Sequence, residues 1–563
     1  MLAAILLAGC AEERAPLPAD AVIHNITVVD VEVGETLPNS AVVVADGKIS
    51  AIVDQARVQN YAAKTLIDGR GGFVMSALAD AHVHLQSYSE LQNFVLHGVG
   101  LVVNMSGGQQ HLEMRDAIAT KRVLGPRVVT MGPTLDGDPS TNPLFVSVNA
   151  ESVGNVVDWI ADQNYDGVKV YQQMDAGTLS ATIGAASRRG LITTGHVSRE
   201  IGVERALSAG QRYVAHGEEL AFEAFDESSR RYDLSAVEPL AAELSQVGAT
   251  VTPMLAYLQN IPRQVNDLDT YLDTEQMRLV PVAARMSFDR RQGWFANRED
   301  PDGFTKQITS LVRFVAVLTT ELQQRGVPLV LGTDAGFGGA IPGYGVHEEL
   351  ESLVEAGLTE VAALRSATLD VGKYLKRIDA DGTSWGLVKP GYAADLVLLG
   401  ANPLDDIRAT RAITGMMLDG RWIDRSELDG IEATLARLQQ TLLPIASAFE
   451  DALVAGDVNA LDAAIDLVPA SMTDEPLISA DSCIFLGYRH YYGGSRGLAG
   501  RLYQRCAAMH PTSSPLWIHI ARSQESEGNT EDAVRSYRRA AELNPWYGDP
   551  RAAIDRLGAE TND

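Results

Sequence analysis

Between about residues 76 and 380 the chain alternates strand-like runs with amphipathic stretches, and this alternation constrains its fold more than any other feature. The strand-like runs are GLVVNM, RVVTMG, GVKVY, LITTGH, RYVAHG, ATVTPM and LVLGTDAG. Strands that alternate with helices favour a parallel sheet, because each parallel connection needs a crossover. Eight such units in roughly 250 to 300 residues fit a closed barrel better than an open sheet. The sequence therefore predicts an α/β fold with a (β/α)8 TIM barrel over residues 76–380.

Two strand-rich segments flank the predicted barrel. Residues 21–75 contain β-branched alternation broken by two Asp-Gly pairs, which is typical of antiparallel hairpins. Residues 381–424 are again strand-rich, as in GLVKPGYAADLVLLG. Neither segment is long enough to enclose a core of its own. We therefore expect both to assemble into one discontinuous β-sandwich domain.

The chain from residue 425 to 563 has helical patterns, and an eight-residue pattern recurs there at a period of 34. This spacing resembles tetratricopeptide repeats, which implies an all-α domain with repeats over 480–513 and 514–547. Such repeats present concave binding surfaces, so a protein partner is expected here. Cys483 and Cys506 would lie on facing helices of one repeat. They either form a disulfide or are two small buried residues.

Composition limits the partners of this chain. Its 46 Lys and Arg residues face 73 Asp and Glu residues, which gives a formal net charge of −27. Nucleic-acid binders need Lys and Arg to neutralise phosphates, so nucleic acid is excluded as a partner. No apolar run reaches the roughly 18 residues that would span a bilayer.

The N-terminus is apolar and ends in a cysteine. Its sequence MLAAILLAGC closes with LAGC, which resembles the lipobox of bacterial lipoproteins. The resemblance implies a signal and linker over residues 1–20 and a lipid on Cys10. The protein would then be lipid-anchored to the bacterial cell envelope, on the periplasmic or extracellular side. The alternative is an ordinary apolar N-terminus, because no basic residue precedes the cysteine.

Metal-ligating side chains stand at the ends of the predicted barrel strands. Two histidines at positions i and i+2 of a strand project from one face, so both imidazoles of DAHVH can reach one metal ion. The carboxyl ends of barrel strands open onto one face, where distant residues converge. Taken singly, the later residues could be a barrel cap, core histidines or a helix cap. Together they predict a site for two divalent metals, made of His82, His84, Lys169, His196, His216 and Asp334.

This ordered set resembles the amidohydrolase superfamily over about residues 21–424. The runs LGPRVVTMGPTL, TTGHVSREIGVERALSAGQRYVAHG and HEELESLVEAGLTEVAALRSAT are most similar to its imidazolonepropionase-like and Xaa-Pro or Xaa-Arg dipeptidase-like branch. The resemblance implies an enzyme that uses metal-activated hydroxide to hydrolyse a carbon-nitrogen bond. A small amide, dipeptide-like, N-acyl or cyclic amide substrate is expected.

The resemblance also implies how the metals are held. His82, His84 and Asp334 would hold one ion, and His196 and His216 the other. Lys169 would bridge them as an N6-carboxylated side chain, which presents two oxygens in place of an ammonium. Zinc is expected, because imidazole and carboxylate ligands suit it.

The remaining roles follow from position. Asp334 is the expected catalytic base, because it would take the proton of the attacking hydroxide and pass it to the leaving nitrogen. Tyr171 lies two residues past the lysine, on the same strand face, and either binds substrate or packs. His347 follows a Gly-rich loop and is expected to bind substrate, with a surface position as its alternative. His97 and His111 are expected to be structural or exposed.

Two competing functions remain open from the sequence. The first is a mononuclear deaminase or cyclic amidase in which Lys169 is unmodified. The second is a non-catalytic binding scaffold built on the repeats. The complete set of six ligands favours an enzyme.

Overall fold

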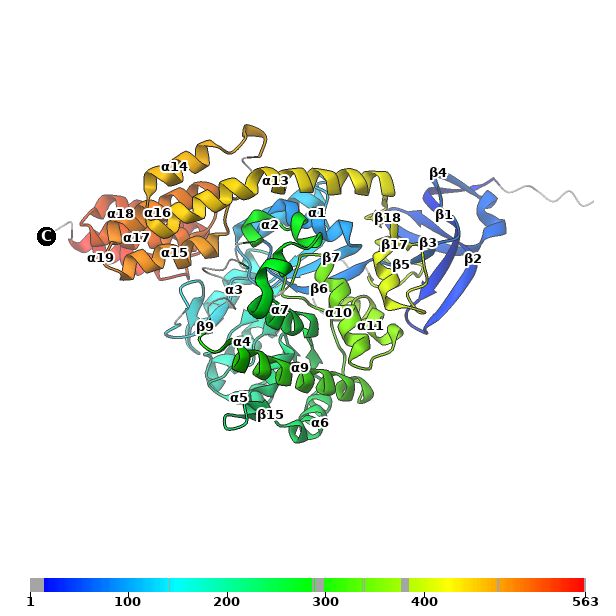
Figure 1. Cartoon of the computed structure of the whole chain (residues 1–563), viewed down its shortest axis with the longest axis horizontal. Coiled ribbons are helices and arrows are strands. Elements are labelled where there is room, and N and C mark those ends of the chain that lie inside the picture. The colour runs from blue at the N-terminus through cyan, green and yellow to red at the C-terminus, as the bar shows by residue number, and fades with distance from the viewer. Residues whose placement is uncertain are drawn as a thin grey trace, which may run out of the picture.

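A computed structural model describes residues 15–140, 142–285, 288, 298–336, 338, 340–375, 384–472 and 475–560. Figure 1 shows a β-sheet at one end of the molecule, a central α/β body, and a helical region at the opposite end. Cys10, the expected lipid attachment site, lies outside the described residues. Among the helices that are described, none is both long and apolar enough to cross a bilayer.

The first strands of the chain and its last strands share one sheet. In spatial order the strands are β19 (Arg421–Asp424), β18 (Ile413–Leu418), β17 (Leu396–Leu399), β5 (Phe73–Ser76), β1 (Leu17–Asp30), β2 (Glu35–Ala45) and β3 (Lys48–Asp54), with β4 (Tyr61–Asp68) paired to β1. As the sequence predicted, strands from before and after the central body assemble together. The sequence predicted a sandwich of two sheets, whereas the described strands form a single eight-stranded sheet.

Both faces of this sheet are covered. Ile23, Val42 and Val44 enter one apolar cluster, whereas Val22 and Val43 enter another. Successive strand residues point to opposite faces, so an unbroken β-branched run serves both clusters. The run therefore belongs to a strand that is buried on both sides.

Parallel strands and helices alternate through the central body, as predicted. One parallel sheet contains β6 (Leu78–Val83), β7 (Val99–Asn104) and β8 (Arg127–Thr130). A second contains β9 (Leu135–Gly137), β10 (Val146–Val148), β11 (Gly167–Val170) and β12 (Ile192–Gly195), and a third pairs β13 (Tyr213–Val214) with β16 (Thr250–Val251). Parallel bridges connect Met131 with Gly167, Val251 with Leu329, and Val83 with Ala335. The described part of the body is thus a mixed α/β structure.

Helices of the central body fill the connections between these strands. They are α1 (Tyr88–Leu96), α2 (Gln109–Ala119), α3 (Val153–Asp162), α4 (Ala176–Arg188), α5 (Gly202–Ser208), α6 (Val237–Val247), α7 (Leu255–Leu272), α8 (Val282–Arg285), α9 (Pro301–Gln324), α10 (Tyr344–Glu355), α11 (Glu360–Ser366) and α12 (Leu369–Leu375). A short hairpin of β14 (Phe225–Asp226) and β15 (Arg231–Tyr232) interrupts the pattern. Capping residues mark where helices begin. The side chain of Asp175, for example, caps α4 by accepting hydrogen bonds from the amides of Gly177 and Thr178.

The chain after β19 is helical, as predicted, and we call its described part, residues 425–560, the helical region. Its helices are α13 (Arg425–Ala455), α14 (Val458–Asp466), α15 (Ala480–Tyr492), α16 (Arg496–Met509), α17 (Ser514–Ser526), α18 (Thr530–Leu543) and α19 (Pro550–Glu560). A Cβ on Gly487 would lie 2.2 Å from Cε1 of Tyr503, so only glycine lets α15 approach α16 this closely. Cys483 and Cys506 join the same two helices by a disulfide.

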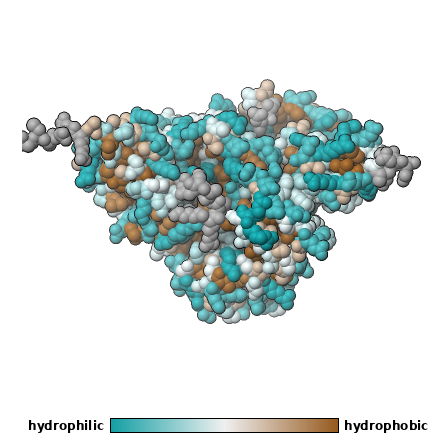
Figure 2. All heavy atoms as spheres, turned by 180° about the vertical axis from the view of Figure 1, so that it is seen from behind, coloured by the Kyte–Doolittle hydropathy of each residue, from teal (hydrophilic) through white to brown (hydrophobic). Residues whose placement is uncertain are grey.

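The helical region docks on the central body. Helix α13 runs from the sheet along the body to the other helices (Figure 1), and it packs against α1 and α8. The side chain of Gln439 accepts a hydrogen bond of 2.9 Å from the amide of Val282. The amide and hydroxyl of Ser89 donate to Glu475 at 3.0 and 2.9 Å. Figure 2 shows the opposite face, where hydrophilic and hydrophobic side chains are interspersed over the molecule.

Candidate metal centre and active-site cavity

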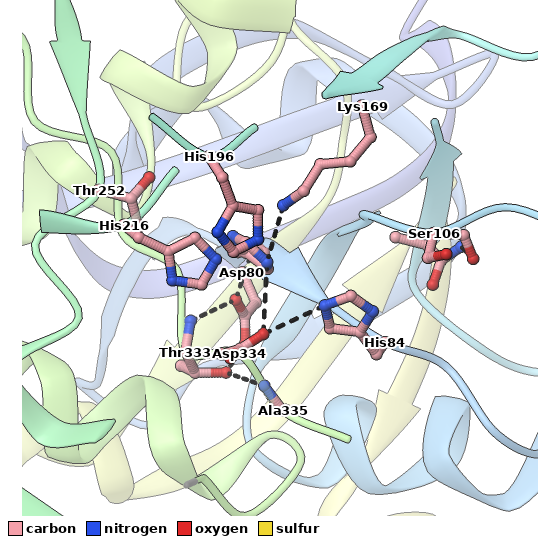
Figure 3. Close-up of polar contacts among 12 residues, drawn as sticks. Asp80, His84, Ser106, Lys169, His196, His216, Thr252, Thr333, Asp334 and Ala335 are labelled. Atoms are coloured by element: carbon pink, nitrogen blue, oxygen red, sulfur yellow. Dashed lines mark hydrogen bonds and ion pairs between the residues drawn. The ribbon is translucent and has the colours of Figure 1, made fainter. Parts of the chain in front are cut away.

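Strand β6 and the segment around Asp334 bring three metal-ligating groups together (Figure 3). The Nε2 atoms of His82 and His84 lie 3.3 and 3.1 Å from Oδ1 of Asp334. Backbone pairing fixes this approach, since the amide of Asp334 donates to the His82 carbonyl at 2.8 Å and the amide of His84 to the Ala335 carbonyl at 2.7 Å. One ligand atom from each of the three side chains lies within 4.8 Å of the others. This triad has the geometry of a metal site.

The backbone at Asp334 is unusual. Its φ of 58° is left-handed, a conformation that costs free energy for a residue with a Cβ. Two residues later Gly336 has a φ of 101°, and a Cβ there would lie 2.1 Å from the His84 carbonyl oxygen. The tight turn after Asp334 therefore requires glycine, and it presents the carboxylate to the two histidines.

Lys169 reaches the same cluster from β11. Its side chain is buried, and its Nζ lies 3.4 Å from Nε2 of His82. Burial lowers the pKa of Lys169 to about 8, although the carboxylates of Asp334, Glu219 and Glu218 favour the ammonium. A sizeable share of the amine is therefore neutral near physiological pH.

His196 and His216 complete the cluster from the ends of β12 and β13. Their rings stack with centroids 4.2 Å apart, and the His216 ring lies 4.7 Å from that of His82. Nδ1 of His196 contacts Oε1 of Glu219 at 2.7 Å, and Nδ1 of His216 contacts Oε1 of Glu218 at 3.1 Å. A carboxylate on Nδ1 holds the proton there and leaves Nε2 as the ligand atom.

These carboxylates were missed by the sequence interpretation. Glu218 and Glu219 follow His216 directly in HGEE, and this acidic pair is the signal that could have identified them. Asp80 was also missed. It accepts hydrogen bonds from the amide and hydroxyl of Thr333 and from the amide of His82, and burial raises its pKa to about 7. Asp80 thus ties β6 to the segment that carries Asp334.

The donor set fits divalent metals. Burial lowers the pKa of His82 and His84, so both imidazoles stay neutral and keep the lone pair that a metal needs. Burial opposes ionisation of Asp334, but its hydrogen bond with His84 and the charges of the surrounding cluster lower its pKa overall. Nδ1 of His82 has no hydrogen-bond partner within the described residues. Neutral imidazoles around a carboxylate are the ligands of hydrolytic zinc sites.

A cavity of about 480 Å³ opens onto this cluster. His84, Lys169, His196, His216 and Asp334 line it, together with Tyr171. The ring of Tyr171 lies 4.3 Å from that of His196, and burial raises the pKa of its phenol to about 12. The phenol therefore remains protonated at neutral pH and is available as a hydrogen-bond donor.

The sequence model of the amidohydrolase family matches residues 73–423, which is more than half of the chain. The chain belongs to the amidohydrolase family. An adenine deaminase from Desulforamulus reducens is 39% identical over 69 residues, and one from Desulfatibacillum aliphaticivorans is 33% identical over 98 residues. These stretches cover 12% and 16% of this chain and only 11% and 16% of the two deaminases.

Solved structures share the fold of this amidohydrolase. A putative prolidase from Bifidobacterium longum has a TM-score of 0.55 and 22% identity, covering 74% of this chain and 100% of its own. A Xaa-Pro dipeptidase with bound methionine has a TM-score of 0.54 and 20% identity, covering 72% and 99%. The bottromycin amidohydrolase has a TM-score of 0.57 and 24% identity, covering 74% and 90%. These likenesses establish the fold.

The structure does not bring His347 to the metal cluster of this amidohydrolase. The side chain is 1% exposed on α10, its Nδ1 lies 2.9 Å from Oγ1 of Thr410, and it is not among the residues that line the cavity. Its expected contact with substrate therefore has no support from its position, because this face of α10 turns into the core. His97 is buried beside it, with ring centroids 5.8 Å apart.

Other cavity residues carried no sequence motif. Aromatic side chains line much of the wall, namely Phe145, Trp159, Tyr165, Phe222 and Tyr257. Arg199 also lines the cavity, with its guanidinium 4.4 Å from the Phe222 ring centroid. His111 is structural, as expected: its Nδ1 accepts from the amide of Gly108 at 2.9 Å and its Nε2 lies 3.0 Å from the Leu85 carbonyl.

Proposed function

We propose that this protein is a binuclear metal-dependent hydrolase that cleaves the carbon-nitrogen bond of a small peptide-like amide. One observation carries the proposal. Four histidines, a lysine and an aspartate from separate segments form one buried cluster at a cavity. Carboxylates contact Nδ1 of two of these histidines, His196 and His216. The structural neighbours include a putative prolidase and a Xaa-Pro dipeptidase, which supports a peptide-like substrate.

The ligand assignment follows the two groups of side chains. His82, His84 and Asp334 would hold one metal ion, and His196 and His216 the other. Lys169 would bridge them as a carbamate, since its partly neutral amine is the form that reacts with carbon dioxide. Zinc is the metal that we propose for this donor set. Two bound ions would lower the pKa of a water and polarise a substrate carbonyl.

The side chains of the protein would move and hold the protons. Asp334, whose pKa is low, would accept a proton from the attacking water and transfer it to the leaving nitrogen. The Tyr171 phenol would donate a hydrogen bond to the carbonyl oxygen as negative charge develops on it. Cavity walls rich in aromatic rings would exclude water around the reacting bond.

Two finer structural features belong to the same proposal. We infer that the central strands close into a (β/α)8 barrel, which the parallel bridges between the three described sheets support. We also infer that α15 to α18 are tetratricopeptide-like repeats, which the packing of each of these helices against the next supports. A protein partner for these repeats is part of that inference.

Metal analysis of Lys169→Met tests the proposed site. We expect about two divalent ions per chain in the unaltered protein, about one in the variant, and a loss of at least about 100-fold in dipeptide hydrolysis. Lys373→Met is the matched control, because this lysine is exposed on α12 and pairs with Asp370. One ion and unchanged activity in Lys169→Met would instead reject the bridged site and favour a mononuclear enzyme in which the lysine is unmodified. An unaltered protein that binds no divalent metal would favour a scaffold.

We also propose that Cys10 anchors the protein to the cell envelope by lipid. The sequence around it is the support for this proposal. Cys10→Ser should release the protein from the membrane fraction into the soluble fraction. Equal membrane association of both forms would contradict it.

A further inference from the structure

The wall of the cavity is built from two separate parts of the chain. One part carries the metal cluster. The other belongs to the helical region and comprises Asp481, Phe485, Leu543, Tyr547 and the loop over 509–515. The family match ends at residue 423, so this second part lies outside the matched amidohydrolase sequence.

The helical region is held firmly enough to serve as a wall. Glu475, five residues before α15, accepts two hydrogen bonds from Ser89 at the start of α1. Leu144, which also lines the cavity, packs on the apolar core of the helical region. The disulfide between Cys483 and Cys506 fixes α15 against α16. Helix α15 therefore has a defined place beside the cavity.

Asp481 is the acidic group of this wall. It lies in the first turn of α15, two residues after the N-cap Ser479, where a helix favours a negative charge. Burial alone raises its pKa to about 6, so its carboxylate is mostly ionised at neutral pH. Asp481 is only partly buried, and its side chain lines the cavity with no cation of the described residues paired to it.

Aromatic rings accompany the carboxylate. Phe485 follows Asp481 by one helical turn on α15, so the two side chains share a face of the helix. Burial raises the pKa of the Tyr547 phenol, the Arg522 cation opposes this rise, and the nearby charge of Asp481 adds to it. A carboxylate beside aromatic faces is an arrangement that recognises an ammonium or guanidinium group.

We propose that the helical region completes the substrate site and that Asp481 binds a positively charged group of the substrate, away from the bond that is cleaved. The proposal rests on the function proposed above for the identity of the cavity. It narrows the substrate class to small amides that carry a cation. That cation is either a free α-ammonium group or a basic side chain.

Two ligand pairs distinguish these sources. Alanyl-lysine and alanyl-Nε-acetyllysine differ by an acetyl group that removes the side-chain charge. Alanyl-norleucine and N-acetylalanyl-norleucine differ by an acetyl group that removes the α-ammonium charge. Binding of each is measured by calorimetry on full-length protein carrying Asp334→Asn, which removes the proposed base and so slows turnover. Because Asp334 is also a proposed metal ligand, the metal content of this variant is measured first. Hydrolysis of the same compounds is measured separately on protein with Asp334 intact.

We expect the charged member of at least one pair to bind about 10-fold more tightly or better, and Asp481→Asn to remove this preference. Affinity for the neutral members should stay within about twofold. Asp481→Glu should keep the preference because it keeps the charge. Asp466→Asn is the matched control, since this acid is exposed on α14 outside the cavity wall.

Equal binding within both pairs, or equal losses for charged and neutral ligands in Asp481→Asn, would overturn the proposal. A preference that depends on Asp481 without hydrolysis of any compound would leave this proposal standing and reject the proposed function. Hydrolysis without such a preference would support the proposed function and reject the role of Asp481.

Discussion

At the scale of single residues, the carboxylates behind the histidines decide whether the cluster can bind metal. Glu219 contacts Nδ1 of His196 and also accepts a hydrogen bond of 2.7 Å from the amide of Val197. A fixed carboxylate at Nδ1 selects the tautomer that has a lone pair on Nε2. The fold therefore leaves Nε2 of His196 unprotonated, which is the state that the proposed metal site needs.

Glu219→Gln tests this role. An amide whose NH2 group faces Nδ1 would favour the tautomer with the proton on Nε2, which cannot ligate. We expect the affinity for one of the two metals to fall about 10- to 100-fold, measured by metal titration after chelation. Glu204→Gln, an exposed change on α5, should leave the affinity unchanged. An unaltered affinity in Glu219→Gln would refute the role.

Glu90 gives a test of pH dependence. Its Oε2 accepts from the amides of Gln86 and Ser87, and burial raises the pKa of its carboxyl to about 8. The folded pKa lies above the unfolded value, so the stability that the protonated form provides is complete below about pH 4.5 and is lost as pH rises toward 8.

Glu90→Gln should therefore gain stability relative to the unaltered protein by about 1 kcal/mol per pH unit between pH 5 and 8. Urea midpoints at four pH values would measure the difference. Glu151→Gln, on the surface before α3, should give a curve parallel to that of the unaltered protein. A constant difference for Glu90→Gln would show that the carboxyl is ionised throughout.

At the scale of elements, the sequence predicts a strand best where its apolar pattern matches the burial of the strand in the fold. The β7 run VGLVVN is buried at every position, so its apolar continuity identified a strand covered on both sides. Asp46-Gly47 lies in the turn of the antiparallel pair β2–β3, as expected. The hairpin expected at Asp68-Gly69 is wrong, because β4 and β5 both pair in parallel with β1 instead of with each other. The sandwich failed because no local signal states whether strands from two ends of a chain hydrogen-bond to each other or only pack.

The disulfide between α15 and α16 makes a second element-scale prediction. Replacing Cys483 and Cys506 together by Ala should lower the stability of the helical region by about 3 kcal/mol, because the cross-link restricts the unfolded chain. Thermal melts with and without reductant would measure it. Reductant should shift the unaltered protein and leave the double variant unchanged. Alkylation of both cysteines in native, unreduced protein would contradict the cross-link.

At the scale of the whole molecule, α13 connects the three regions. Leu428 and Leu435 on this helix belong to the same apolar cluster as the interior of the central body. The helix therefore fixes the helical region beside the cavity, and the position of Asp481 depends on it.

Leu435→Ala should test this connection. The residue is 1% exposed, so the cavity left behind should lower stability by about 3 kcal/mol and increase protease cleavage within the helical region. Leu443→Ala is the control on the same helix, because Leu443 is 39% exposed. Equal melting temperatures for the two variants would show that the packing of Leu435 does not stabilise the protein.

The sequence by itself determined the strand-helix alternation, the helical C-terminus and the six side chains that the structure brings into one cluster. These are local patterns, and parallel strands bring their carboxyl ends to one face whatever the loops do. The pairing of Glu219 with His196, the burial of His347 and the helical wall were decided only by the tertiary structure. Each depends on contacts between segments far apart in the chain, whose docking is set by the packing of many side chains together.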